Sequence, residues 1–316
     1  PLARDIDLDP LFDLMDDQDV LKVFHSASQD MEVFFSVSGR VPEPIFDTQI
    51  AAMVAGYGEQ VGYATLASQI VGVTLDKSSQ LTDWSLRPLS DRQIEYALGD
   101  VTHLCTIYEE LHDRLEESGR RSWVSEEMLA LTDVSSYKPN PREAYRRIRI
   151  RRPSRKALAV LREVVAWREE TAQRRNLPRN WVIRDDALVE ISTHAPQNVM
   201  DLSRVRGLRG NAAKGRDGES LLKAVQRALN MPQNEWPEIP PRRPPIRGHE
   251  ALVALLQTLL RLRCEDHDVA QKLVATRDEL DRIATTSDEN LRPLQGWRRE
   301  LFGNDALELK AGRLGL

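Results

Sequence analysis

Three side chains in the first hundred residues are of types that could support metal-assisted phosphoryl chemistry. Tyr96 and Asp100 lie four residues apart in "SDRQIEYALGDVTHL" (90–104), so in a helix they project from neighbouring turns of one face. Asp30 lies at the start of another helical segment, just after a β-rich run that ends near His25. A helix that begins at a strand's end directs side chains into the crevice in which α/β folds bind ligands. Two carboxylates and a phenol in one crevice suit metal-assisted phosphoryl chemistry.

The same residues also have structural explanations. Asp30 can be a first-turn acid that the helix dipole favours, and Tyr96 can be a core aromatic residue with a solvated hydroxyl. Spacing alone favours these structural roles. We interpret His25 as a turn residue and Asp47 as a helix cap rather than as metal ligands.

The segments around these residues alternate between strand and helix. The pattern predicts a strand over "VLKVFHS" (20–26) and a helix over "SQDMEVFFSVSG" (28–39) that ends at Gly39. "IFDTQIAAMVAG" repeats this order, and "YATLASQIVG" predicts another short helix. We therefore expect residues 1–135 to form an α/β domain.

A capping box marks the start of the helix that carries Tyr96 and Asp100. Ser90 and Gln93 have the spacing at which a side chain and a backbone group cap each other. The helical pattern after them can run to Gly119.

The rest of the chain has a helical pattern. A basic connector (136–153) precedes four predicted helices that form a small bundle over 154–230. The segment 231–246 has six prolines in sixteen residues, which predicts a stiff linker, and helical periodicity resumes over 247–316. "WVIRDDAL" (181–188) reappears as "LVATRDEL" in the last segment, which predicts two copies of one helical module.

Composition limits the function classes. No apolar run approaches the ~20 residues of a membrane span, so we expect a cytoplasmic protein without membrane contact. Cys105 and Cys264 lie far apart, and no cysteine–histidine spacing typical of a zinc site occurs.

Charge is unevenly distributed along the chain. Residues 1–141 contain 25 acids and 10 bases, whereas residues 142–184 contain 4 acids and 14 bases. A basic belt with two tryptophans, Trp167 and Trp181, is typical of a surface that contacts a nucleic-acid backbone. Alternatively, the arginines of 146–152 pair with the acidic N-terminal part.

Three consecutive blocks of the sequence resemble one known family. "FHSASQDMEVF", "IFDTQIAA" and "GVTLDKSSQLTDWSLRPLSDRQIEYALGDVTHL" resemble ribonuclease D, a DEDD-type 3′-5′ exonuclease family with a ribonuclease H-like fold. The helical part resembles the HRDC modules that follow the nuclease in this family. The resemblance implies an α/β ribonuclease H-like exonuclease domain, incomplete at its N-terminus, followed by two all-α HRDC-like bundles.

The resemblance also implies roles for the three residues. Tyr96 and Asp100 match the family's Tyr-x-x-x-Asp motif, in which the tyrosine positions water and the aspartate binds metal, and Asp30 matches the aspartate of the middle motif. Asp30 and Asp100 would bind two divalent ions, Mg²⁺ or Mn²⁺.

Several further residues are candidates for binding the substrate. Lys77, Gln80, Trp84 and Arg87 belong to the longest matching block and could bind a single-stranded 3′ end through phosphate contact and base stacking, although structural roles explain them equally well. In the basic belt we expect Arg174, Arg175 and Arg179 to contact RNA.

One motif of the family is not found in this sequence. Asp-x-Glu, which supplies two more carboxylates from the first strand, has no convincing match, because "RDIDLDP" lies too close to Asp30 and has no β-rich flank. We therefore expect a fragment or a truncated form with weakened or no activity alone, since two-metal hydrolysis requires ions ~4 Å apart with several carboxylate ligands.

The preferred interpretation is a metal-dependent 3′-5′ exoribonuclease that trims tRNA precursors and other RNA with a single-stranded 3′ end, acting as a monomer. One alternative is a DNA-trimming exonuclease. A second is a non-catalytic nucleic-acid-binding scaffold, which the missing motif favours and the presence of Asp30, Tyr96 and Asp100 together opposes.

Overall fold

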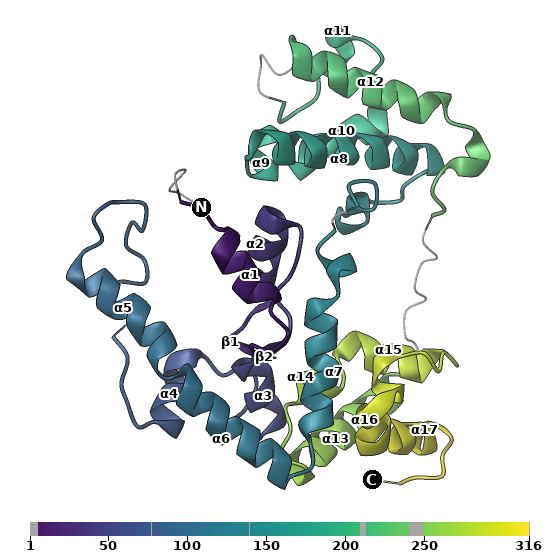
Figure 1. The fold of residues 1–316 in the computed structure, drawn as a ribbon. Helices are drawn as coiled ribbons and strands as arrows, with labels where there is room; N and C mark the ends of the chain where they lie inside the picture. Colours follow the sequence, from purple (N-terminus) through teal and green to yellow (C-terminus); the bar gives the residue numbers. More distant parts are fainter. Residues whose placement is uncertain (1–5, 77, 139, 209–212, 240–248, 316) are drawn as a thin grey trace. The chain divides into compact units, whose positions relative to one another are not determined.

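Two compact units make up the structure (Figure 1). The computed structural model describes residues 6–76, 78–138, 140–208, 213–239 and 249–315. Unit 1 combines residues 1–137 with residues 244–316, and unit 2 comprises residues 138–243. The division into five segments made from the sequence stays a prediction.

Unit 1 contains a short parallel sheet and many helices. The N-terminal part contains α1 (Asp9–Asp16), β1 (Lys22–Phe24), α2 (Ser28–Ser38), β2 (Ile45–Asp47), α3 (Thr48–Val54), α4 (Tyr63–Ile70), α5 (Asp91–Thr102), α6 (Leu104–Glu117), α7 (Arg121–Thr132) and η1 (Val134–Ser136). The C-terminal part contains α13 (Glu250–Asp266), α14 (Gln271–Val274), α15 (Arg277–Thr285), η4 (Arg292–Leu294), α16 (Gly296–Arg298), η5 (Arg299–Gly303) and α17 (Asn304–Lys310).

The two strands that the described residues form are parallel. Lys22 pairs with Ile45 and Phe24 with Asp47, so the carboxyl ends of β1 and β2 lie at one edge. The strand predicted over 20–26 is confirmed in shortened form.

Local sequence signals place the helix ends correctly. Gly39 ends α2 in the left-handed region at φ 75°. The Asp47 side chain caps α3, and Ser90 and Gln93 form the predicted capping box of α5. These signals are short-range contacts between neighbouring residues, which is why they can be predicted from sequence.

The helix predicted to run from residue 90 to Gly119 is broken. α5 ends at Thr102 and α6 begins at Leu104. In an unbroken helix the Gly99 carbonyl would accept from the His103 N–H, but here the Tyr63 hydroxyl donates to that carbonyl at 2.9 Å. The predicted unbroken helix was wrong. The helical pattern reports only on neighbouring residues, whereas this competing donor lies 36 residues away in sequence.

One hydrophobic core joins the N-terminal and C-terminal parts of unit 1. It contains residues from α2, α3, α6 and α7 together with residues from α13 to α17. The Ala270 N–H donates to the Met53 carbonyl at 3.0 Å, and the rings of Trp123 and Trp297 stack at 4.4 Å. The C-terminal helices are therefore an integral part of unit 1.

Unit 2 is a small helical bundle with a core of its own. It contains η2 (Ala144–Arg147), α8 (Arg155–Arg175), α9 (Arg179–Val182), α10 (Asp185–His194), α11 (Val199–Leu202), α12 (Arg216–Asn230) and η3 (Gln233–Glu235). The long α8 packs against α10 and α12. The four predicted helices are confirmed. The described part of the proline-rich segment contains only the short turn η3, and its residues 240–246 lie outside the described residues.

Unit 2 and the C-terminal part of unit 1 have helices in the same order of length. In unit 2 a long helix (α8) is followed by a four-residue helix (α9) and a medium one (α10). In unit 1 the order recurs as α13, the four-residue α14 and α15. The two sequence echoes begin in α9 and α14, so they occupy equivalent places.

Candidate active site

Asp47 organises the strand edge at which the candidate site lies. Its buried carboxylate, 2% exposed, accepts from the Ser26 and Ala27 N–H groups at 3.0 and 2.7 Å, which shapes the turn between β1 and α2. The same carboxylate accepts from the Gln49 N–H at 2.8 Å at the start of α3. Asp47 therefore fixes the starts of two helices, and its predicted role as a cap is confirmed.

His25 lies at the same edge, directly after β1. Its Nδ1 is 2.9 Å from the Thr48 hydroxyl, and its ring meets that of Tyr63 edge-on at 5.6 Å. Burial lowers the pKa of His25, while the charges of Asp47 and Asp100 oppose this shift. Its Nε2 is buried and has no hydrogen-bond partner among the described residues. The contact with Thr48 fits the turn-shaping role expected for His25.

Tyr96 and Asp100 line one pocket of about 480 Å³. Gln80 from the preceding loop and Tyr63 from α4 line it too. A hydrogen bond with Tyr96 lowers the pKa of Asp100, although desolvation by burial is the larger effect and raises it overall. A phenol and a carboxylate thus meet at the wall of one cavity, as their spacing predicts.

Asp30 lies in the first turn of α2 and is not among the residues that line this pocket. Burial raises its pKa, and the charge of Asp47 adds to the increase. The negative charges of Asp47 and Asp100 both favour a higher pKa for His25. The charge of Asp47 thus affects the pKa of both Asp30 and His25, and the charge of Asp100 affects that of His25.

The carboxylates of Asp30 and Asp100 match the donor chemistry of Mg²⁺ or Mn²⁺. Carboxylate oxygen is the ligand that these hard cations prefer. Within the described residues, however, no three Asp, Glu, His or Cys side chains form a group that could hold a metal ion. The role of Asp30 and Asp100 as metal ligands therefore stays a prediction.

The raised pKa of Asp100 can be tested without substrate. We expect carboxyl NMR titration of the metal-free protein to give Asp100 a pKa above the ordinary value of 3.8. A raised folded-state pKa means that the folded protein binds this proton more tightly than the unfolded chain does, so the contribution of Asp100 to stability falls as pH rises above 3.8. A pKa at or below that of an ordinary aspartate would contradict this environment.

The expected substrate-binding residues have different surroundings. Gln80 lines the pocket, and the Trp84 ring lies 5.8 Å from the Tyr96 ring. The Arg87 guanidinium donates to the Trp84 and Leu86 carbonyls at 2.9 and 2.8 Å, so it also stabilises its own loop. Lys77 lies outside the described residues.

Of the residues that line the pocket, sequence reasoning named Gln80, Tyr96 and Asp100, and Arg92 and Tyr63 are among those that it missed. Arg92, Tyr96 and Asp100 follow each other at spacings of four, so the helical period that identified the other two also indicates Arg92. Tyr63 has no such signal, because its place depends on the fold that brings α4 to α5.

The basic belt of unit 2 is partly neutralised by neighbouring acids. Arg175 forms a two-point ion pair with Asp217 at 2.8 and 2.5 Å, and Arg179 lies 3.6 Å from Glu169. Arg174 donates to the Thr171 hydroxyl.

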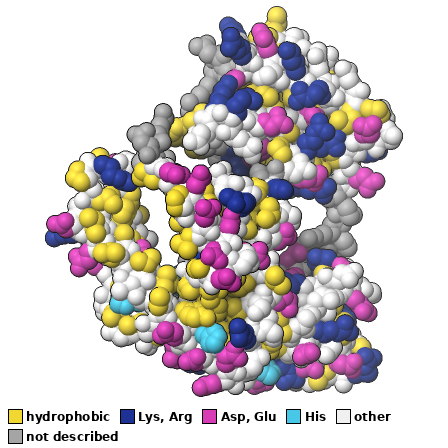
Figure 2. All heavy atoms as spheres, in the orientation of Figure 1, with side chains coloured by type: hydrophobic (Ala, Val, Ile, Leu, Met, Phe, Trp, Pro, Cys, Tyr) yellow, Lys and Arg dark blue, Asp and Glu magenta, His cyan; other side chains and the backbone are white. Residues whose placement is uncertain are grey.

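Other basic side chains of unit 2 remain on its surface, and many lie on the face that Figure 2 shows. The alternative interpretation paired the arginines of 146–152 with the acidic N-terminal part. Arg146 pairs instead with Glu143 in its own unit. Of the two tryptophans of the belt, Trp181 is 69% exposed, whereas Trp167 is buried and donates to the Ser220 hydroxyl. Trp181 can therefore offer a ring for base stacking and Trp167 cannot.

Comparison with known proteins shows the family to which the chain belongs. Residues 2–116 match the model of a 3′-5′ exonuclease domain, and residues 157–225 match that of the HRDC domain. The chain is 47% identical over 316 residues to ribonuclease D of Granulibacter bethesdensis, covering 100% of this chain and 80% of that protein. The chain belongs to the ribonuclease D family. It is therefore a hydrolase of the 3′-5′ exoribonuclease class.

Other members agree with this assignment. Ribonuclease D of Nitrobacter hamburgensis is 47% identical over 315 residues, covering 100% of this chain and 82% of that protein. The crystal structure of Escherichia coli RNase D superposes with a TM-score of 0.80 at 30% identity, covering 97% of this chain and 83% of that one. The predicted ribonuclease H-like exonuclease and HRDC architecture is thereby confirmed for one domain of each kind. No helix in the described part of the chain is both long and apolar enough to cross a membrane.

Proposed function

We propose that this chain carries the Asp30, Tyr96 and Asp100 part of a site that removes nucleotides from the 3′ ends of RNA. The observation that carries the proposal is the pocket in which Tyr96, Asp100 and Gln80 meet. The pocket adjoins the strand edge at which α/β folds bind substrates.

Two divalent cations, Mg²⁺ or Mn²⁺, are proposed as the cofactors, with Asp30 and Asp100 among their ligands. When bound, such ions activate water and stabilise the charge on the leaving oxygen. The raised pKa values of both aspartates indicate carboxylates whose charge is poorly solvated in the metal-free protein, and a cation would relieve that cost.

Tyr96 is proposed to orient the attacking water. Burial and the charge of Asp100 raise the pKa of Tyr96, so its hydroxyl keeps its proton at neutral pH and can donate a hydrogen bond. The terminal nucleotide would lie against Gln80, with Trp84 adjoining Tyr96 as a ring for base stacking.

Residues 1–316 alone are proposed to cleave weakly or not at all. Two aspartates cannot supply the oxygen ligands that two cations need, and within the described residues no third acidic or histidine side chain completes a metal-binding group with them. Full-length enzyme is therefore the material for the activity tests below.

The proposed substrates are RNA precursors with an unpaired 3′ end, including tRNA precursors. Support comes from the E. coli relative, which is described as an exoribonuclease involved in structured RNA processing. The repeated order of helices supports a second HRDC-like module over residues 247–316. Arg174, Arg175 and Arg179 remain proposed RNA contacts, with Arg175 and Arg179 exchanging their present acidic partners for phosphates.

Digestion of matched oligonucleotides tests this function. We expect the full-length enzyme to shorten RNA with an unpaired 3′ end by single nucleotides, and the same sequence as DNA more slowly, because an RNA site can use 2′-hydroxyl contacts. Chelation should stop the reaction, and added Mg²⁺ or Mn²⁺ should restore it. Equal rates on DNA would support the DNA-trimming alternative, and binding without cleavage would support a scaffold.

A further inference from the structure

A groove of about 670 Å³ lies on the C-terminal helices of unit 1, outside the candidate active site. Its lining comes from α13, α14, the start of α15 and Glu59 of the loop before α4. Leu260, Ala275 and Leu280 are its buried members. Polar and basic side chains make up most of the remaining lining.

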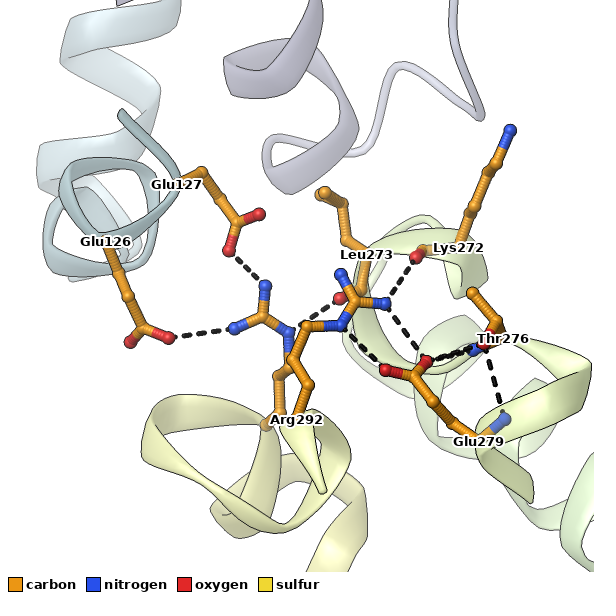
Figure 3. Close-up of polar contacts among 8 residues, drawn as sticks. Glu126, Glu127, Lys272, Leu273, Thr276, Glu279 and Arg292 are labelled. Carbon is orange, nitrogen blue, oxygen red and sulfur yellow. Dashed lines mark hydrogen bonds and ion pairs between the residues drawn. The ribbon is translucent and has the colours of Figure 1, made fainter. Parts of the chain in front are cut away.

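Three of the lining side chains are basic and exposed: Arg261, Lys272 and Arg277. Within the described residues, no ion pair involves the side chain of Arg261 or Lys272, and Arg277 lies 3.2 Å from Asp281 on its own helix. Figure 3 shows the Lys272 side chain extending away from the polar contacts around Glu279. At least two of the three charges are thus available to an outside ligand.

The single acidic side chain of the described lining already has a partner. Glu59 accepts a hydrogen bond from the Lys272 backbone N–H at 3.2 Å. The groove as a whole therefore favours an anion with several charges.

One short loop contributes lining residues to both the groove and the candidate active site. Glu59 lines the groove, and Gly62 and Tyr63 line the pocket of Tyr96 and Asp100. Three peptide links of 3.8 Å separate residues 59 and 62, so their Cα atoms are at most about 11 Å apart.

The loop between the two cavities is held in place on both sides. The Gln49 side chain donates to the Val61 carbonyl at 3.0 Å. Gly56 has φ +87°, and a Cβ there would come within 2.4 Å of the Asp268 carboxylate, so α3 and the C-terminal part meet closely. The loop that contributes lining residues to both the groove and the pocket is therefore anchored within unit 1.

We propose that this groove binds the phosphodiester backbone of the RNA strand upstream of the 3′ end held in the active site. The inference rests on the proposed function, which supplies RNA as the polyanion. On this proposal, a strand that leaves the pocket near Tyr63 would follow the loop of residues 59–63 toward Arg261, Lys272 and Arg277. Contacts to phosphate give affinity without sequence preference, as an enzyme that trims varied RNA ends requires.

Binding measured in the presence of a chelator tests the proposal without hydrolysis. The full-length enzyme and the triple variant Arg261→Ala, Lys272→Ala, Arg277→Ala are titrated with single-stranded RNA at several salt concentrations. Loss of three phosphate contacts should weaken binding at least about tenfold and reduce the slope of log affinity against log salt by about 2. Single variants Arg261→Gln and Lys272→Gln should each reduce the slope by about 0.7, which keeps the test valid if the triple variant does not fold.

A matched triple variant elsewhere in the C-terminal part of unit 1 controls for overall charge. Arg299→Ala, Lys310→Ala and Arg313→Ala remove the same charge outside the groove and should leave affinity and salt slope nearly unchanged. Equal losses in both triple variants, or no change in either, would overturn the proposal and leave another occupant, such as a protein, for the groove. Since binding is measured without cleavage, failure of the hydrolysis test would not affect this result.

Discussion

Replacing Asp100 with asparagine in the full-length enzyme is expected to lower the single-turnover rate of RNA 3′-end cleavage by about a thousandfold, because a metal ligand contributes several kcal/mol of transition-state stabilisation. RNA affinity should change only slightly, since the neutral amide occupies the same volume in the pocket. Tyr96→Phe should be less damaging, because it removes one hydroxyl that orients water and leaves the carboxylate in place. The measurement is rapid quenching of a 3′-end cleavage reaction with enzyme in excess.

Asp91→Asn is the matched control for this prediction. Asp91 belongs to the same helix but does not line the pocket of Tyr96 and Asp100. It should keep nearly full activity. The thermal stability of Asp100→Asn should not fall at neutral pH, because burial penalises the charged form of Asp100. An Asp100→Asn enzyme that trims RNA at the normal rate would contradict the proposed site.

Replacing Arg298 with alanine is expected to destabilise unit 1 by about 3 to 5 kcal/mol, because it removes one partner of a buried ion pair. Arg298 is 2% exposed, and its guanidinium pairs with Glu126 at 2.9 Å and with Glu127 and donates to the Leu273 carbonyl at 2.7 Å. Figure 3 shows Glu126 and Glu127 pointing from α7 toward the C-terminal helices. Without Arg298, the carboxylate of Glu127, which is 13% exposed, loses this partner.

Urea unfolding followed by tryptophan fluorescence measures this effect. Trp123 and Trp297 stack beside Arg298, which lies 4.5 Å over the Trp297 ring, so they report on this part of unit 1. Arg299→Ala is the control, because Arg299 is exposed. Adding Glu127→Leu to Arg298→Met should restore part of the stability, since a buried ion pair can be replaced by apolar side chains. An unchanged midpoint for Arg298→Ala would show that the C-terminal helices do not stabilise the nuclease part in this way.

Features set by neighbouring residues were predictable from the sequence. The capping box at Ser90, the left-handed stop at Gly39 and the cap at Asp47 each depend on residues a few positions apart. The helical period likewise placed Tyr96 and Asp100 on one face, and the structure places both in one pocket.

Features set by distant residues were not predictable. The helix break at His103 occurs where the Tyr63 hydroxyl donates a hydrogen bond to the Gly99 carbonyl. The charge of Arg175 is neutralised by Asp217, which lies 42 residues away in sequence. The shared core of the N-terminal and C-terminal parts depends on contacts such as Arg298 with Glu126, 172 residues apart. Periodicity identifies a buried face, but it does not say which distant segment covers that face.

Anomalous scattering from Mn²⁺ in crystals of the full-length enzyme tests the central claim most directly. We expect Mn²⁺ peaks bonded to carboxylate oxygens of Asp30 and Asp100, with the Tyr96 hydroxyl facing a water on the ion that Asp100 binds. Mn²⁺ bound elsewhere, with both carboxylates free of metal in an enzyme that still trims RNA, would contradict it.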